Sequence, residues 1–303
     1  MKLPFKIQPS TQAFRASFFI NIIALIFYFI VIGGFSINDL GYFILTFFTA
    51  SIVLENFLTS YKTRLEEINI LKDQENYRRE FLGNVSHELK TPLFTIQGYI
   101  LTLIEGALKD KKVRGKYLRR SAKGVDRLIS IVKDLDLITQ FESGIKTVDK
   151  TDFNIYELIE NVYDLMEFES EKNNTKLLVY NENNTPVIVN ADKERILQVL
   201  TNLVVNSIKY GKEGGYTKVK VEEYDKDRII VIVKDNGEGI EDEHLPRLFE
   251  RFYRIDKNRS RKKGGSGLGL SIVKHIIEAH QEQIFVESKI GQGTEFSFTL
   301  KKP

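Results

Sequence analysis

Two long apolar runs near the N-terminus constrain this chain more than any other feature. Residues 16–35 contain no charged side chain, and a helix needs about 20 apolar residues to cross the hydrocarbon core of a bilayer. A short polar turn, residues 36–39, leads into a second apolar run at residues 40–58. We therefore predict a two-helix transmembrane hairpin over residues 16–58, in contact with membrane lipid.

Both outer flanks of this hairpin are basic, with Lys2, Lys6 and Arg15 before it and Lys62 and Arg64 after it. The turn carries only Asp39, and basic flanks remain on the cytoplasmic side of a membrane. We therefore expect a multi-pass protein of the cell (inner or cytoplasmic) membrane. Residues 1–15 and everything after the hairpin, including any catalytic part, are expected in the cytoplasm.

A cleaved signal peptide is the main alternative for the first apolar run. It is disfavoured because the run is longer than the apolar region of such peptides, lacks a clear cleavage site and is followed at once by a second run. A hairpin buried inside a soluble protein is favoured even less.

The composition excludes several classes of chemistry. The chain has no Cys, which excludes a disulfide scaffold, a thiolate zinc site and a cysteine nucleophile. Its net charge of +3, from 44 basic and 41 acidic residues, is too small to indicate a nucleic-acid partner, and we predict none.

Residues 59–78 read as a charged helical stalk. Apolar residues recur there at steps of three and four, as in a coiled-coil seam, at Leu58, Tyr61, Leu65 and Ile68. Lys72 and Glu75 occupy the next seam positions. A coiled coil and a single solvated helix therefore both remain open.

Two stronger apolar stripes follow, separated by a polar break at residues 109–112. The first comprises Val85, Leu89, Leu93, Ile96, Ile100, Leu103 and Ala107, and the second comprises Leu118, Ala122, Val125, Ile129, Val132 and Leu135. This pattern predicts an antiparallel helical hairpin over residues 79–145. Since one hairpin cannot close its own core, we predict a homodimer whose two hairpins form a four-helix bundle.

His87 lies off the first stripe. It is two positions from both Val85 and Leu89, about 200° around a helix, which places it on the solvent face. An exposed His is usually an idle surface residue. Glu88 follows it directly, Thr91 lies one turn later, and Pro92 stands inside the predicted helix, where it removes a hydrogen bond and allows a kink.

The string FLGNVSHELKTPL, residues 81–93, resembles the phosphoacceptor box of sensor histidine kinases. The resemblance implies that His87 takes a phosphoryl group and that Glu88 orients its imidazole and receives its proton. It also implies that Thr91 positions a water for dephosphorylation of a partner.

Residues 146–303 switch to a mixed pattern of helices and strands. Helices are expected within residues 151–173, over 191–210 and over 273–280. Strands are expected at residues 176–180, 187–189, 219–223, 228–233, 284–287 and 295–300. The run at 228–233 is apolar after Arg228, which is typical of an inner strand. We predict an α+β sandwich of helices on one sheet.

Four clusters in this part carry candidate chemistry. Asn202 and Asn206 lie one turn apart on one helix face, where two carboxamides could hold the magnesium that accompanies ATP, although such pairs usually just face water. Residues 235–239 place a carboxylate and two glycines after the inner strand, which suits an adenine amino group. Residues 249–252 read as a hydrophobic anchor. The glycine run at 264–270 opens a helix and suits phosphate, without the Lys of a Walker A loop.

In this order the clusters resemble the N, G1, F and G2 boxes of the GHKL ATP-binding fold. The resemblance implies that Asn206 coordinates Mg²⁺ with help from Asn202, that Lys209 contacts phosphate, that Tyr210 stacks near the base and that Asp235 binds the adenine amino group. It assigns the remaining pocket and lid to Gly237, Gly239, Phe252, Gly265, Gly267, Leu268, Gly269 and Thr294. The basic run at 253–263 matches the ATP lid, and we choose Arg254 as its phosphate contact.

The resemblance implies a sensor histidine kinase that phosphorylates itself on His87 from Mg-ATP and passes the phosphoryl group to an Asp of a response regulator receiver domain. One alternative is a GHKL-type ATPase, which uses a Glu to activate water at the position of Asn202; a carboxamide is a poor base. The other is a membrane scaffold that binds ATP without phosphotransfer.

Overall fold

The computed structural model describes residues 11–32, 37–142, 148–180, 185–255 and 265–303. The chain divides into two compact units, Met1–Glu80 and Phe81–Pro303, and each is treated by itself below. Part of the predicted membrane turn and most of the predicted lid, residues 256–263, lie outside the described residues.

The first unit consists of helix α1, Thr11–Ile32, and the first part of helix α2, Ile37–Ile104. Large apolar side chains such as Phe19, Ile30 and Phe57 are exposed along it. A helix that is apolar on every side is typical of a membrane span. Among the described residues one helix is long and apolar enough to cross a membrane, Ile44–Ile104 within α2, and a shorter apolar helix covers Phe18–Ile30.

The predicted hairpin is therefore supported for one of its two helices, and the pair stays a prediction. The turn predicted at residues 36–39 is partly wrong, because Ile37–Asp39 form the first turn of α2. The stalk residues belong to the same helix, with Tyr61, Leu65 and Ile68 exposed.

The second unit begins with a helical hairpin. Helix α2 continues through Pro92 to Ile104, a short 3₁₀ helix η1 covers Ala107–Lys109, and α3 spans Lys111–Glu142. Helix α2 ends at Ile104, before the predicted break at 109–112. Ala107 therefore lies in η1 and not on the apolar stripe of α2. Gly106 causes this, since its φ of 136° lies outside the helical region. Asp110 then accepts hydrogen bonds from the first amides of α3.

Helix α3 has two apolar faces. Ile131, Leu137 and Ile138 are buried, and α3 lies against α7. The stripe predicted to form a four-helix bundle with a second copy is exposed within the single chain, at Leu118, Val125, Ile129 and Val132, and the dimer stays a prediction. The sequence pattern identified the stripe but not the second face, which packs on α7 in the α+β part described next.

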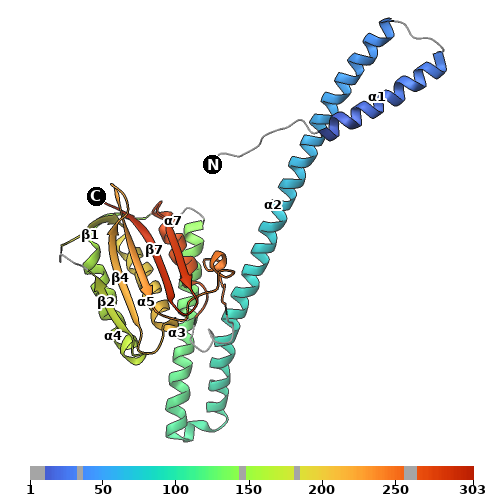
Figure 1. The fold of residues 1–303 in the computed structure, drawn as a ribbon. Coiled ribbons are helices and arrows are strands. Elements are labelled where there is room, and N and C mark those ends of the chain that lie inside the picture. Colours follow the sequence, from blue (N-terminus) through green and yellow to red (C-terminus); the bar gives the residue numbers. More distant parts are fainter. Residues whose placement is uncertain (1–10, 33–36, 143–147, 181–184, 256–264) are drawn as a thin grey trace. The chain divides into compact units, whose positions relative to one another are not determined.

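The α+β part, Thr151–Lys301, is a five-stranded sheet with helices on one face (Figure 1). In spatial order the strands are β2 (Lys176–Tyr180), β4 (Tyr216–Glu223), β5 (Arg228–Asp235), β7 (Gly293–Lys301) and β6 (Ile284–Lys289). Strands β2 and β4 are parallel and the other pairs are antiparallel. The covering helices are α4 (Ile155–Lys172), α5 (Lys193–Tyr210) and α7 (Gly269–Ala279), and a 3₁₀ turn η2 covers Leu245–Arg247.

Alternation along the strands places the core between sheet and helices. In β5, Ile229, Val231 and Val233 are buried and the residues between them are partly exposed. The predicted α+β sandwich and the inner position of β5 are confirmed. A small sheet of β1 (Thr151–Asn154) and β3 (Ile188–Ala191) was partly missed, because the sequence of β1 has no apolar alternation and its partner is distant in the chain.

A buried histidine joins the end of α7 to the start of α5. His280 is 1% exposed; its Nε2 accepts a hydrogen bond from the Asp192 amide at 2.9 Å, and its Nδ1 lies 2.7 Å from the Ile276 carbonyl. This pattern requires a neutral ring with its proton on Nδ1. Burial lowers the pKa of His280, and the Lys150 charge acts in the same direction.

This arrangement makes the stability of the α+β part sensitive to acid. Since the folded pKa of His280 lies below 6.5, the unfolded chain binds the proton first, and stability is lost as pH falls below 6.5. We expect this group to lower the free energy of unfolding as pH falls from 7.5 to 5.5, with a slope of at most about 1.4 kcal/mol per pH unit. His280→Gln, which keeps an acceptor but does not titrate, should flatten this dependence in urea unfolding followed by circular dichroism.

The other titrating groups are the same in the wild type and in His280→Gln, so their effects cancel when the two pH dependences are compared. Burial also lowers the pKa of His275, and it raises the pKa of Asp134 to about 6. Equal pH slopes for the wild type and His280→Gln would contradict the role given to this histidine.

Candidate functional site

A cavity of about 390 Å³ lies between α5, the loop after β5, the start of α7 and helix α3. It gathers residues from three of the four predicted clusters, at 202–210, 235–239 and 264–270, and none from the cluster at 249–252. Those lining it are Asn202, Asn206, Lys209, Tyr210, Asp235, Gly239, Arg254, Gly265, Gly267, Gly269 and Thr294. Segments more than 90 residues apart in the sequence therefore meet at one site.

Helix α5 presents the two carboxamides. Asp192 caps its first turn by accepting from the Arg195 amide at 3.1 Å. One stripe of α5 is buried under the sheet, and Asn202 and Asn206 lie beside that stripe, half-buried in the cavity wall. The buried hydroxyl of Ser207 lies 2.6 Å from that of Thr217. This bond links α5 to β4.

Asp235 is the buried carboxylate of the cavity, at the end of β5. Its Oδ1 accepts hydrogen bonds from the amides of Gly237 at 2.8 Å and Thr294 at 3.1 Å. Burial raises the pKa of Asp235, and these two hydrogen bonds oppose the rise. Both bonds end on Oδ1, so they fix the orientation of the whole carboxylate, including the position of Oδ2.

Lys209 and Tyr210 close the C-terminal end of α5 at the cavity. Burial lowers the pKa of Lys209, and the nearby charge of Arg127 acts in the same direction while Glu169 opposes it. Tyr210 is 42% exposed, and its hydroxyl would lie 3.7 Å from a Cβ placed on Gly265.

Three predicted pocket residues do not line the cavity. Gly237 supports Asp235 through its amide. Leu268 is fully buried in the core at the start of α7. Phe252 adopts a φ of 61° and donates its amide to the Gly267 carbonyl at 2.9 Å. These residues lie behind the cavity wall and support the residues that line it.

The hairpin residues lie on the exposed side of α2. His87 and Thr91 are exposed, and the Thr91 hydroxyl donates to the His87 carbonyl at 3.2 Å. Glu88 is 12% exposed and forms ion pairs with Arg127 of α3 at 3.1 Å and with Arg254 at 3.4 Å. Because Arg254 also lines the cavity, this contact joins the neighbour of His87 to the nucleotide pocket.

Helix α3 contributes a cavity wall that sequence reasoning missed. Ser130 and Asp134 both line the cavity, and burial raises the pKa of Asp134 to about 6. The pattern of α3 offered no signal for them, because both looked like solvent-facing positions of the hairpin.

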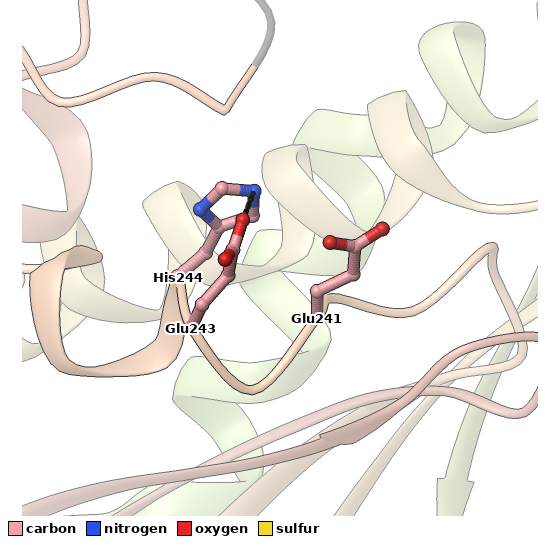
Figure 2. A group of neighbouring side chains, drawn as sticks. All are labelled: Glu241, Glu243 and His244. Carbon is pink, nitrogen blue, oxygen red and sulfur yellow. Dashed lines mark ion pairs between the residues drawn. The ribbon is translucent and has the colours of Figure 1, made fainter.

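A second group of ligating side chains lies beside η2, at Glu241, Glu243 and His244 (Figure 2). His244 Nδ1 is 2.9 Å from the Tyr253 hydroxyl, and its Nε2 is 3.6 Å from Glu243. Both carboxylates are exposed. This is ordinary surface chemistry, and we assign no metal to it.

Two families match consecutive parts of the chain. Residues 77–144 match the family described as the His Kinase A (phospho-acceptor) domain, and residues 191–303 match the histidine kinase-, DNA gyrase B- and HSP90-like ATPases. The first match contains His87 and the second contains the cavity residues of α5, β5, α7 and β7. The chain belongs to the sensor histidine kinases.

The chain is similar to curated kinases and to solved ones. It is 37% identical over 229 residues to sensor histidine kinase WalK of Bacillus subtilis (strain 168), covering 75% of this chain and 37% of that relative. The histidine kinase ThkA, solved in complex with response regulator protein TrrA, aligns with a TM-score of 0.59 and 28% identity over 79% of this chain and 66% of that one. ShkA, solved with AMPPNP, aligns with a TM-score of 0.56 and 26% identity over 74% and 46%.

Two glycines with the same backbone angle test the packing behind the site. Gly267 and Gly291 both have a φ of 79°, but a Cβ at Gly267 would lie 2.8 Å from the Phe252 backbone, whereas one at Gly291 would meet nothing within 4 Å. Gly291→Ala should cost about 1 kcal/mol of stability through the left-handed backbone alone. Gly267→Ala should cost about 1–3 kcal/mol more, because Phe252 must move.

Urea unfolding of the two variants measures this difference directly. Equal losses would show that the Phe252 backbone yields without cost and that Gly267 is required only for its φ angle.

Proposed function

We propose that this chain is a protein-histidine kinase that phosphorylates its own His87 from Mg-ATP and then passes the phosphoryl group to an Asp of a response regulator. One observation carries the proposal. The carboxylate beside the exposed His87 is bonded to Arg254, a residue of the nucleotide cavity. Donor site and acceptor residue therefore belong to one connected structure within residues 81–303.

The cavity residues fit ATP. Asp235, whose Oδ1 is already held by two amides, would receive the adenine amino group, and Tyr210 would stack near the base. Lys209 and Arg254 would contact the phosphates, together with the backbone amides of the glycine run.

The cavity residues also suit Mg²⁺ through oxygen donors. Asn206, assisted by Asn202, would hold the ion, because Mg²⁺ is bound by a few protein oxygens and the phosphates. The ion would neutralise charge on the transferred group.

The transfer step then uses His87 and Glu88. One ring nitrogen of His87 attacks the γ-phosphorus while the bond from phosphorus to the bridging oxygen breaks, and ADP leaves with that electron pair. The proton on the other ring nitrogen passes to the Glu88 carboxylate. For dephosphorylation of the response regulator, Thr91 would position the attacking water.

The receiver domain of a response regulator is the proposed second substrate. ThkA was solved with a response regulator protein, and this chain aligns with ThkA over 79% of its length. The exposed side of α2 around His87 is the surface that must be reached.

A homodimer would cover the exposed stripe of α3. Four apolar side chains at heptad-like spacing remain exposed within one chain: Leu118, Val125, Ile129 and Val132. Two copies of the hairpin would bury them in a four-helix bundle.

We also propose the membrane organisation predicted above. Residues 16–58 would form a two-helix hairpin in the cell membrane, with residues 1–15, the stalk at 59–78, the phosphoacceptor part at 79–145 and the ATP-binding part at 146–303 in the cytoplasm. The exposed apolar side chains of α1 and α2 support contact with lipid.

The kinase proposal is tested by labelling. Full-length chain in nanodiscs, incubated with Mg²⁺ and ATP labelled at the γ-phosphate, should acquire label that is stable to alkali and labile to acid. His87→Gln should abolish the label, at least 100-fold, because the attacking nitrogen is gone. Thr91→Ala should still become labelled.

Steady phosphate release without any label would favour the GHKL-type ATPase, and nucleotide binding with neither activity would favour the scaffold. Label that persists at wild-type level in His87→Gln would contradict the assignment of the acceptor.

The dimer is tested by charge on the exposed stripe. Ile129→Glu combined with Val132→Glu should convert the detergent-solubilised full chain from dimer to monomer in light scattering, because two carboxylates cannot be buried in an apolar bundle. Lys123→Glu, which also adds an exposed carboxylate to α3 but off the stripe, should remain dimeric. A double variant that stays dimeric would rule out this interface.

A further inference from the structure

Glu88 is held by two arginines from different parts of the second unit. Its Oε2 lies 3.1 Å from Nη2 of Arg127, and its Oε1 lies 3.4 Å from Nη1 of Arg254. The Glu88 and Arg254 side chains are 12% and 7% exposed, and that of Arg127 is 30% exposed. Arg127 has no role in the function proposed above, yet it makes the shorter of the two contacts.

The contact between Glu88 and Arg127 is built into the hairpin. Gly124 lets α3 approach α2 closely, since a Cβ there would lie 2.6 Å from Ile96 and 3.8 Å from the Pro92 carbonyl. Arg127 comes three residues after Gly124, and Glu88 comes four residues before Pro92. Because the two helices are antiparallel, moving three residues forward along α3 and four residues back along α2 leads in the same direction. The side chains of Arg127 and Glu88 therefore meet.

The contact between Glu88 and Arg254 is of another kind. Arg254 lines the nucleotide cavity and follows Phe252, whose ring packs on Phe81 of α2 with centroids 5.9 Å apart. A triphosphate in the cavity offers Arg254 a more highly charged partner than one carboxylate. Arg127 is therefore the partner that remains with Glu88 when nucleotide is present.

We propose that Arg127 is a positioning residue for Glu88 in the phosphorylation of His87, an inference that rests on the function proposed above. Arg127 keeps Oε2 of Glu88 in a fixed place beside His87. Oε1, released when Arg254 turns to the nucleotide, is then the oxygen that accepts the imidazole proton. Without Arg127 the carboxylate would lose its one ion-pair partner among the described residues of the hairpin and would follow Arg254 or turn to water.

The test is a double-mutant cycle on initial rates of label incorporation, with full-length chain in nanodiscs and γ-labelled ATP. Arg127→Gln should lower kcat about tenfold and leave KM for ATP within twofold. Arg127→Lys, which restores a cation, should recover part of that loss. In the Glu88→Gln background, already slow, Arg127→Gln should change the rate less than twofold, because Arg127 acts through the carboxylate.

Arg120→Gln is the matched control. It removes an arginine two turns earlier on α3 that donates to the Tyr99 hydroxyl at 3.2 Å. Among the described residues the hydrogen bonds and ion pairs of the Glu88 side chain go to Arg127 and Arg254 and not to Arg120, so the rate should stay within twofold. Circular dichroism of each variant verifies that the helices are intact, and Arg127→Lys keeps the test valid if Arg127→Gln folds poorly.

Three outcomes for Arg127→Gln would overturn the inference, and two outcomes for other variants would overturn the function on which it rests. A raised KM with unchanged kcat in Arg127→Gln would make Arg127 a nucleotide contact. An equal loss in both Glu88 backgrounds would make its role merely structural. Full activity of Arg127→Gln together with a slow Glu88→Gln would contradict only the role given to Arg127. Full activity of Glu88→Gln would contradict the role of Glu88 as the base. Persistent label in His87→Gln would contradict the assignment of His87 as the acceptor.

Discussion

The division of α5 between core and cavity is the constraint on which the rest of the site depends. One stripe of this helix, from Ile196 through Leu203, is fully buried, and each such aliphatic side chain contributes about 1.5–3 kcal/mol. Because side chains on a helix are fixed relative to one another, this burial also determines where Asn202 and Asn206 point. Rotating α5 to move the carboxamides would expose the stripe. The core therefore holds the site in place.

Charge links this rigid site to the hairpin. Arg254 belongs to the cavity and also bonds Glu88, while Arg127 bonds the same carboxylate from α3. A largely buried carboxylate is costly without a partner, and the two arginines supply cations to Glu88 from both sides. Under the function proposed above, this shared carboxylate would make the residue beside His87 sensitive to what occupies the cavity. Packing of Phe81 on Phe252 brings the two parts into contact at the same place.

Local signals made much of the fold and site predictable. The alternation in β5, the period of α5 and the glycines at 237, 239, 265, 267 and 269 appear directly in the sequence. The early end of α2 at Ile104 was missed, although Gly106 was a visible signal for it. Strand β1 was missed because four residues without alternation carry no signal until β3 pairs with them. Asp134 looked like a solvent-facing position, since nothing in α3 indicates that its second face meets the catalytic part.

The sequence by itself determined the apolar runs, the exposed setting of His87, the order of helices and strands and the family to which they belong. These properties depend on neighbours within about one or two helical turns. The tertiary structure alone decided that Glu88 is shared by Arg127 and Arg254, that His280 ties α7 to α5, and which face of α3 stays exposed. Such contacts join residues up to 166 positions apart, and their geometry exists only once the elements have packed.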